Sequence, residues 1–334
     1  NSIMKYEKIF ITGSTGVVGR PLLKKLVKEG HKVYALTRTD NNDEYFEQLG
    51  VTPVRGDLFD DSLKDKLFNL NIDAIFHVAG VNKMCSKNPS NMFKANIDGT
   101  KSMLSLGNSL KIKKFVYTSS AVTLGEQHGT VGSETSEHRG RFLSRYEESK
   151  YLAEKEAFEF TKDYEFVSIN PSSVQGPGRV SGTAKLLIST LNRKRPPLIK
   201  NNISIVDIDD CTKGHYLGLL NGKNNERYVL NSFYLQSHEL VNILKSVTGW
   251  SGSPIYISKS LLRLIGPIGD LVKIISSTPP FICSESVRVL TNGHMYDGTK
   301  AKKDLGFRYI NVEKFIEKTV NWLVDEGRIS LEKI

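Results

Sequence analysis

Short apolar runs alternate with helical patterns along the first half of the chain. The runs are nearly continuous in apolar residues, which is typical of strands buried on both faces of a sheet. Strands that alternate with helices imply crossover connections and a parallel sheet. The pattern therefore predicts a doubly wound α/β fold. The expected strands are 8–12, 32–37, 52–55, 73–79, 114–119 and 165–170, and the expected helices are 17–29, 89–110 and 143–163.

The rhythm changes after residue 170, where glycine and proline crowd the stretch 171–197. We expect a smaller, mixed α/β C-terminal domain, some of whose strands return to the first sheet. The predicted division is residues 1–175, with a returning segment near 203–232, and residues 176–334. The later elements expected are strands at 203–206 and 227–230 and helices at 209–221, 238–248, 259–275 and 312–325.

Composition changes this picture only through its charge. The 334 residues include 46 Lys and Arg against 36 Asp and Glu, a formal net charge of +10. A basic excess suits nucleic acid, an anionic membrane surface or phosphorylated small molecules. Because no basic tail or zinc-finger spacing accompanies it, we expect no nucleic-acid partner and read most of the excess as a solvated lysine surface. The seven histidines form no ligand cluster, so no metal site is expected.

Three cysteines, Cys85, Cys211 and Cys283, are too few and too scattered for a disulfide framework, and they lack paired metal-ligand spacing. We therefore expect reduced thiols in a cytoplasmic protein. The first twenty residues lack the uninterrupted apolar core of a signal peptide.

The most apolar long stretch, 261–275, is interrupted by Arg263, Asp270 and Lys273, so we expect no transmembrane segment. A packed helix pair of the second domain is the simplest interpretation of this stretch. A lid over a hydrophobic substrate and a patch that touches a membrane surface are the alternatives.

Glycines recur at every third position from 13 to 19, between the first strand and the first helix. Glycine is needed where a backbone turns sharply and where a pyrophosphate approaches the amides closely. The helix N-terminus adds free N–H groups and a partial positive charge. The pattern favours a dinucleotide phosphate site over a plain tight turn. This site comprises Gly13, Ser14, Thr15, Gly16, Val17, Val18 and Gly19.

The end of the second strand indicates which dinucleotide binds. An acidic residue there would bind the ribose of NAD, whereas Arg38 offers a planar fork suited to a 2′-phosphate. We therefore expect NADP. NAD stays the alternative, because acidic residues at 40, 43 and 44 would repel a 2′-phosphate if they faced it. A solvated surface role is the other interpretation of Arg38. Asp57 is expected either to hold the adenine amino group or to cap a helix.

Tyr146 and Lys150 stand four residues apart in a predicted helix, and so share one face. A nearby ammonium favours the phenolate and lowers the pKa of a tyrosine, which makes the pair a plausible acid–base device. Ser119 and Ser120 lie at the C-terminal tip of the fifth strand, where ligands bind in open α/β sheets. Ser120 would donate a hydrogen bond to a substrate oxygen.

These motifs and several shorter ones together carry a likeness to a known family, in the segments 12–19, 56–58, 76–79, 96–100, 117–120, 146–150, 170–177 and 206–210. Over essentially its whole length the chain resembles the extended short-chain dehydrogenase/reductases, the NAD-dependent epimerase/dehydratase family. Segments 119–125, 297–301 and 305–307 resemble the dihydroflavonol-4-reductase-like branch, which includes the hopanoid-associated sugar epimerase group. The resemblance implies a Rossmann NADP-binding domain followed by a substrate-binding domain.

By this resemblance, Tyr146 is the catalytic acid–base, and Lys150 binds the nicotinamide ribose while lowering the pKa of the tyrosine. Ser120 orients the substrate oxygen, with Ser119 as the alternative, and Asn96 supports the site from below. The backbone near Pro171 and Val174 would meet the nicotinamide carboxamide. Other residues implied to contact the cofactor are Leu58, Val78, Ala79, Gly80, Thr118, Ser119 and Ser173.

Three function classes stay open. The first is an NADP(H)-dependent oxidoreductase that reduces a carbonyl or oxidises an alcohol of a small substrate, a hydrophobic carbonyl compound being one candidate. The second is a nucleotide-sugar epimerase or dehydratase with retained NAD(P). It is disfavoured because 201–205 lack an arginine and because Ala121-Val122, not an acidic pair, follow Ser120. Arg179 or Arg193 would then have to grip the diphosphate. The third is a non-catalytic NADP-sensing protein. A monomer or a homodimer is expected.

Overall fold

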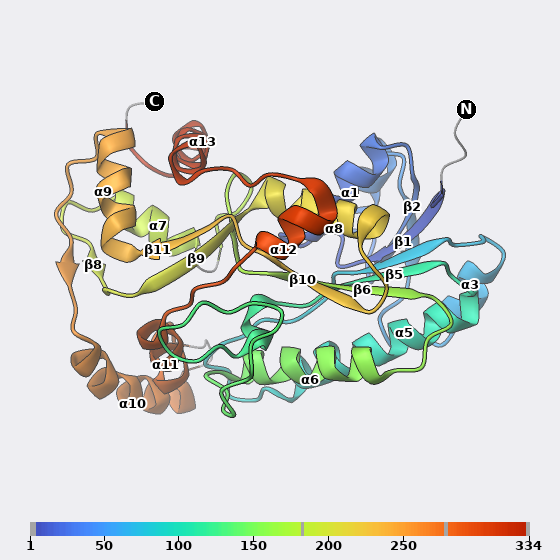
Figure 1. Ribbon diagram of the computed structural model, residues 1–334, viewed down its shortest axis with the longest axis horizontal. Coiled ribbons are helices and arrows are strands. Elements are labelled where there is room, and N and C mark those ends of the chain that lie inside the picture. The colour runs from blue at the N-terminus through green and yellow to red at the C-terminus, as the bar shows by residue number, and fades with distance from the viewer. Residues whose placement is uncertain (1–4, 182–183, 277–279, 332–334) are drawn as a thin grey trace.

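A seven-stranded parallel sheet forms the centre of the larger lobe in a computed structural model, which describes residues 5–181, 184–276 and 280–331 (Figure 1). The strand order is β10-β6-β5-β4-β1-β2-β3. The predicted α/β class with a Rossmann-like sheet is confirmed. The strands are β1 (Lys8–Thr12), β2 (Lys32–Thr37), β3 (Thr52–Arg55), β4 (Ala74–His77), β5 (Lys114–Thr118), β6 (Glu165–Pro171) and β10 (Glu226–Leu230).

Helices cover both faces of this sheet because successive side chains of each strand point to opposite faces. In β1, Ile9 and Ile11 pack with helices α1 and α8, whereas Phe10 packs with α5 and α6 on the other side. Figure 1 shows α1 and α8 above the sheet and α5 and α6 below it. The helices of this lobe are α1 (Gly19–Lys28), α2 (Asp43–Gln48), α3 (Leu63–Phe68), α4 (Ser90–Phe93), α5 (Gly99–Leu110), α6 (Arg145–Glu159) and α8 (Ile208–Asn221).

Several predicted boundaries move in the structure. The helix expected at 89–110 is interrupted, because a π-helical turn at Lys94–Asp98 joins α4 to α5. A short 3₁₀ turn at Ala121–Leu124 follows β5. The strand expected at 203–206 does not enter the large sheet, whereas the one expected at 227–230 does, as β10 beside β6.

The smaller lobe contains a three-stranded mixed sheet of order β11-β9-β7 and a two-stranded pair of β8 and β12. Leu244, Phe315 and Trp250 belong to its separate core. The stretch 171–197, expected to be loop-rich, contains β7, α7 and the start of β8. The strands are β7 (Ser173–Gln175), β8 (Pro197–Leu198), β9 (Asn202–Asp207), β11 (Phe233–Gln236) and β12 (Ile255–Tyr256), and the helices are α7 (Ala184–Leu191), α9 (Ser237–Thr248), α10 (Lys259–Ile275), α11 (Ser284–Asn292), α12 (Thr299–Ala301) and α13 (Val312–Asp325). A π-helical turn at Lys302–Gly306 follows α12.

The expectation that the cysteines are reduced is wrong for two of the three. Cys85, in the loop after β4, forms a disulfide with Cys283, at the N-cap of α11. The pairing was hidden from spacing because 198 residues separate the two cysteines, and only the packing of the lobes brings them together. Cys211 is free and buried in α8. Among the described residues, no helix is long and apolar enough to cross a membrane.

Candidate active site

The turn between β1 and α1 leaves no room for side chains at two of its glycines. A Cβ on Gly13 would lie 2.5 Å from the Ala79 nitrogen, and one on Gly19 would lie 1.9 Å from the Gly13 oxygen. The N-cap residue Val18 makes no side-chain cap bond, and the Ser14 hydroxyl is buried without a hydrogen-bond partner among the described residues. These features fit a pyrophosphate, which would accept from the helix N-terminus and from Ser14.

One continuous cavity of about 1560 Å³ runs from this turn into the smaller lobe. It is lined by every residue assigned above to cofactor binding or catalysis except Asn96. The structure thus brings together side chains from six strand ends and from helix α6. Those lining the cavity are Gly13, Ser14, Thr15, Gly16, Val17, Val18, Gly19, Arg38, Asp57, Leu58, Val78, Ala79, Gly80, Thr118, Ser119, Ser120, Tyr146, Lys150, Pro171, Ser173 and Val174.

Arg38 lines the cavity and is exposed, without an ion-pair partner among the described residues. Of the acidic residues at 40, 43 and 44, Asp43 is held in an ion pair with Arg55 at 2.6 Å. Asn41 and Asn42, not Asp40 or Glu44, line the cavity beside it.

Asp57 also lines the cavity, and its carboxylate accepts a hydrogen bond from the Phe59 backbone N–H at 2.7 Å. The interpretation of Asp57 as a helix cap is wrong, since the N-cap of α3 is Ser62.

Lys150 is buried on α6 and reaches the sheet. Its Nζ donates to the Thr118 carbonyl at 2.8 Å and to the Tyr117 hydroxyl at 3.1 Å. Burial lowers the pKa of this ammonium to about 8, and the Glu154 carboxylate acts in the opposite direction. The lysine is therefore fixed in place, and its charge is sensitive to mildly alkaline pH.

Tyr146 stands one helical turn before Lys150 and faces the cavity. Burial raises the pKa of the phenol, while a hydrogen bond with Ser120 and the positive charge of Arg179 lower it. The expected lowering of this pKa by the Lys150 ammonium stays a prediction. A raised pKa keeps the phenol protonated near neutral pH, in the form that donates a proton.

Asn96 lies beneath the cavity, in the π-helical turn between α4 and α5. Its amide nitrogen donates to the Ser149 hydroxyl and to the Val81 carbonyl, both at 2.9 Å, and its amide oxygen accepts from the Val81 N–H at 2.8 Å. Ser149 in turn donates to the Tyr146 carbonyl at 2.9 Å. Asn96 thus joins the loop after β4 to the helix that carries the tyrosine and lysine.

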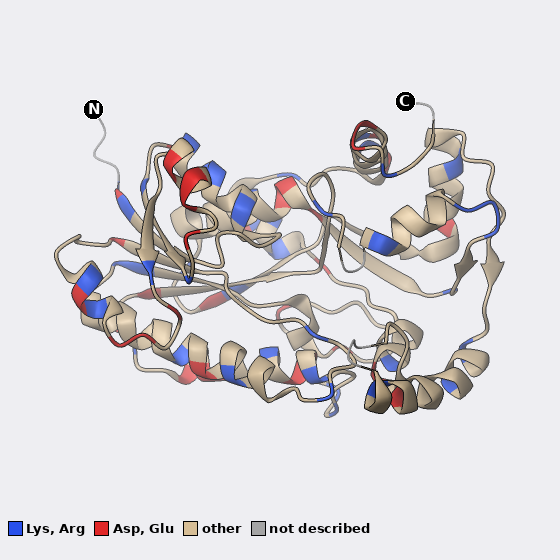
Figure 2. Ribbon diagram, turned by 180° about the vertical axis from the view of Figure 1, so that it is seen from behind, with Lys and Arg blue, Asp and Glu red and all other residues tan. Residues whose placement is uncertain are grey.

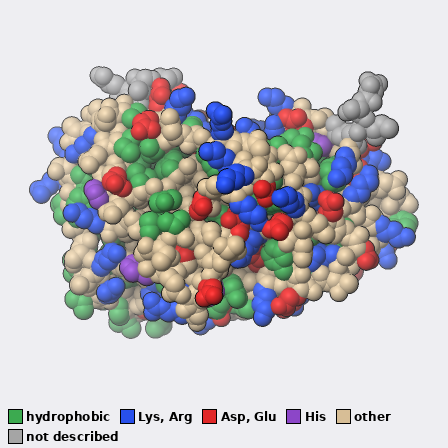
Figure 3. All heavy atoms as spheres, viewed as in Figure 1, with side chains coloured by type: hydrophobic (Ala, Val, Ile, Leu, Met, Phe, Trp, Pro, Cys, Tyr) green, Lys and Arg blue, Asp and Glu red, His purple; other side chains and the backbone are tan. Residues whose placement is uncertain are grey.

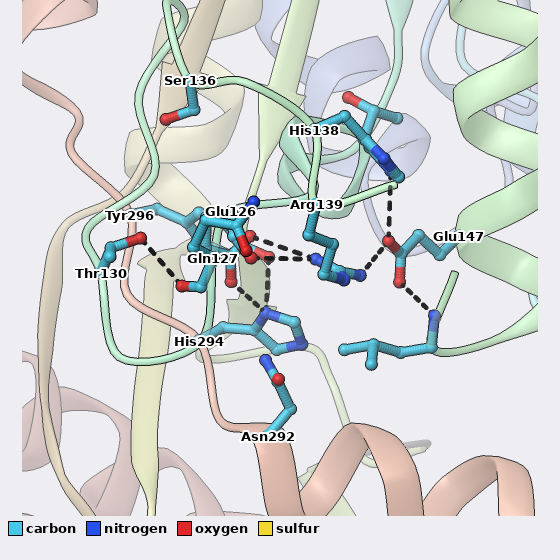
Figure 4. A network of polar contacts seen from close by, with 12 residues as sticks. Glu126, Gln127, Thr130, Ser136, His138, Arg139, Glu147, Asn292, His294 and Tyr296 are labelled. Carbon is cyan, nitrogen blue, oxygen red and sulfur yellow. Dashed lines mark hydrogen bonds and ion pairs between the residues drawn. The ribbon is translucent and has the colours of Figure 1, made fainter. Parts of the chain in front are cut away.

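A buried polar network supports the first turn of α6, and sequence reasoning missed it (Figure 4). Glu147, next to Tyr146, pairs with Arg139 and accepts from the Leu143 N–H at 3.0 Å. Glu126 lies 3.9 Å from Arg139 and pairs with His294 at 2.6 Å. Burial raises the pKa of Glu147, and Arg139 lowers it. One sequence carries no signal for this network, because buried and exposed charged residues look alike in it.

His77 is fully buried in β4 and contacts two threonine hydroxyls. Its ring nitrogens meet the hydroxyls of Thr12 at 2.8 Å and Thr100 at 3.1 Å, and burial lowers its pKa to about 3. The potential metal-ligand group among the described residues consists of Cys85, Cys283 and Glu285. Its two sulfurs are bonded to each other, so it offers no thiolate.

The far half of the cavity is mainly apolar. Arg179 stands at its entrance beside Tyr146, where its guanidinium donates to the backbone carbonyls of Val174 and Ser181. Arg193 lines the wall from an exposed position. The apolar side chains that line this part of the cavity include Leu186, Leu187, Leu198, Leu240, Val241, Leu244, Ile257, Leu262, Phe281, Ile282, Phe315 and Val320.

Comparison with known proteins agrees with this geometry. The model of the "NAD dependent epimerase/dehydratase family" matches residues 9–230. A bifunctional dihydroflavonol 4-reductase/flavanone 4-reductase from Malus domestica is 28% identical over 298 residues, 78% of this chain and 85% of the relative. A 2-alkyl-3-oxoalkanoate reductase from Shewanella oneidensis is 24% identical over 324 residues, 91% of this chain and 82% of the relative.

A similar fold occurs in solved structures. Gre2 from Candida albicans, solved in complex with NADPH, has a TM-score of 0.75 and 21% identity, and the match covers 95% of this chain and 98% of that one. The family model covers more than half of the chain and ends at β10, the last strand of the large sheet. The chain therefore belongs to the NAD-dependent epimerase/dehydratase family, as an NAD(P)-dependent enzyme of the extended short-chain dehydrogenase/reductase type.

Proposed function

We propose that the protein is an NADPH-dependent carbonyl reductase that acts on a hydrophobic ketone or aldehyde and oxidises the corresponding alcohol in reverse. The observation that carries this proposal is the position of Tyr146, which is paired with Ser120 where the cofactor half of the cavity meets its apolar half. NADPH, when bound, supplies the hydride. Ser120 and Tyr146 hold the carbonyl oxygen by hydrogen bonds, and Tyr146 gives it the proton.

The proposal of NADP, rather than NAD, rests on Arg38. Its guanidinium lines the cavity without an ion pair among the described residues, and Asp43, one of the acidic residues expected to oppose a phosphate, is paired with Arg55. A planar cation in this state suits a 2′-phosphate. The Malus and Shewanella relatives are named as reductases, which supports the same reaction direction here.

The lining of the far cavity argues against a nucleotide sugar. A diphosphate would need several free donors. Arg179 already donates to two backbone carbonyls, which among the described residues leaves Arg193 as the free guanidinium on the wall, and leucine, valine and isoleucine dominate that wall. We also propose that residues 1–175, with the segment near 203–232, bind the cofactor, and that residues 176–334 complete the substrate site. The position of β10 in the large sheet supports this division for 226–230.

The test is to mix the purified protein with NADPH or NADH and a panel of ketones, aldehydes and nucleotide sugars. Net oxidation of NADPH by an apolar carbonyl compound is the expected result. Isomerised nucleotide sugar without net cofactor turnover would contradict the proposal and favour the epimerase class.

A further inference from the structure

Helix α10 (Lys259–Ile275) presents an apolar stripe to solvent. Leu264, Ile268, Leu271 and Ile275 are 73%, 59%, 62% and 85% exposed. Together with Leu261 and Val272 they follow the three- and four-residue spacing of one helix face. Hydrophobic side chains gather along the lower left edge of the molecule, over this helix (Figure 3). Such a stripe normally faces a protein core, so its exposure indicates a surface that is covered in use.

The opposite face of α10 is fixed against α11. A Cβ on Gly269 would lie 1.8 Å from the Ile282 carbonyl oxygen, and one on Gly266 would lie 3.1 Å from the Ser284 Cα. The backbones therefore touch, and the disulfide at Cys283 ties this pair to the loop after β4. Of the interpretations of 261–275, the packed helix pair is confirmed. The stripe itself points away from the cavity, which does not suit a lid.

Unpaired cations lie around the start of α10, and one more, Lys273, lies in its last turn. Backbone bonds from Ser253 to Lys194 and from Ile257 to Leu198 hold the basic segment 193–200 beside it. Figure 2 shows Lys and Arg on α10 and on the neighbouring chain at the same end of the molecule. None of the seven basic residues here forms an ion pair with a described residue, and the one acid of α10, Asp270, accepts a hydrogen bond from Ser284. The seven are Arg193, Lys194, Arg195, Lys200, Lys259, Arg263 and Lys273.

We propose that α10 docks in the plane of a membrane that contains anionic lipids, with its apolar stripe in the interface and the neighbouring cations on the lipid headgroups. An amphipathic helix with basic flanks has the chemistry of such a surface. A second copy of the chain fits less well, because a two-fold contact would set the same cations against each other. If the proposed function holds, docking also places the apolar cavity, which Leu262 lines from the inner face of α10, one helix away from the phase where hydrophobic substrates dissolve.

The test is co-sedimentation of the full chain, without substrate, with vesicles of phosphatidylcholine alone or mixed with phosphatidylglycerol. We expect binding to the mixed vesicles that weakens with added salt. Ile268→Glu should reduce it by about tenfold or more. Phe68→Glu on α3 is the matched control, since both side chains are 59% exposed on a helix, and it should bind normally. Circular dichroism melts of both variants establish that they fold.

Three outcomes would overturn docking: no binding to mixed vesicles, equal binding by folded Ile268→Glu, or a dimer in size-exclusion chromatography that Ile268→Glu dissociates while vesicles stay unbound. The last would assign the stripe to a second copy. Vesicle binding is measured without substrate or cofactor, so a negative reductase assay does not change the result of the co-sedimentation. Conversely, a protein that fails to bind vesicles can still be a reductase.

Discussion

Lys150 donates a hydrogen bond to the hydroxyl of Tyr117, with 3.1 Å between Nζ and the phenol oxygen. The same ammonium lies 4.7 Å from the centroid of the Tyr117 ring. The lysine comes from α6 and the tyrosine from β5, so this contact fixes α6 to the sheet. Burial raises the pKa of Tyr117, which therefore stays neutral and accepts from Lys150 across the working pH range.

Reductase activity should decline as pH rises through about 8, where Lys150 loses its proton. Because burial lowers the pKa from 10.5, the unfolded chain binds this proton more tightly, so the stability contribution of Lys150 rises between pH 8 and 10.5. Loss of activity in that range therefore reflects the site and not unfolding. The pH profile of kcat/KM, with a thermal melt at each pH, checks this. A flat profile to pH 10 would contradict it.

Tyr117→Phe should move the alkaline limb of that profile to lower pH. The variant removes an acceptor that favours the charged lysine, and the lost bond is worth about 0.5–1.5 kcal/mol. Thr118 keeps its carbonyl contact, so the lysine stays in place. An unchanged alkaline limb in the folded variant would show that the hydroxyl does not act on Lys150.

Tyr146→Phe should lower kcat by about 10²–10⁴-fold, the usual contribution of a positioned acid. The aromatic ring still fills its place, so NADPH affinity, measured by fluorescence titration, should stay close to that of the wild type. Ser120→Ala should lower kcat by a smaller factor, because it removes one hydrogen-bond donor to the carbonyl oxygen but leaves Tyr146 as the proton donor. Full turnover by the phenylalanine variant would refute the assigned acid.

Arg38→Ala should raise the KM for NADPH by about 10- to 100-fold, corresponding to roughly 1.5–3 kcal/mol for hydrogen bonds to a charged group. NADH lacks the 2′-phosphate, so its KM with the same variant is the internal control and should change little. An equal increase in KM for both cofactors would mean that Arg38 does not bind the 2′-phosphate.

Arg139→Met should destabilise the fold by about 3–5 kcal/mol, because it leaves Glu147 buried without its cation. Arg145→Met is the matched control, since Arg145 pairs with Glu148 on the surface of the same helix and should cost at most about 1 kcal/mol. Urea denaturation measures both. Similar losses in the two variants would show that the buried network in Figure 4 adds no particular support to α6.

Reduction of the disulfide between Cys85 and Cys283 should lower the free energy of unfolding by about 2–5 kcal/mol. The double variant Cys85→Ser/Cys283→Ser should show the same loss and no further response to reductant. A wild-type protein that is indifferent to reductant would indicate that the bond does not constrain the unfolded chain.

Most strands of the large sheet could be predicted from the sequence, because each depends on a short local pattern of apolar residues. Successive side chains of Lys8–Thr12 pack into the two cores on opposite faces of the sheet, and the apolar run that predicts this strand is contained in five residues. The turn that follows requires glycine at 13 and 19, because a side chain there would clash with the backbone. The spacing of Tyr146 and Lys150 follows from one helical turn. Helix α7 was missed because the surrounding glycines and prolines mask an eight-residue pattern.

The sequence by itself determined the fold class and the glycine turn after the first strand, since each depends on neighbours a few positions apart. The family resemblance supplied most of the other residues that line the cavity beside this turn. The tertiary structure alone decided that Cys85 meets Cys283, that Asp43 pairs with Arg55, and that Arg139 is buried against Glu147. It also decided that the apolar side of α10 faces solvent. Periodicity shows that a helix has two faces, but only the packing of distant segments determines which face is covered and which charges are neutralised.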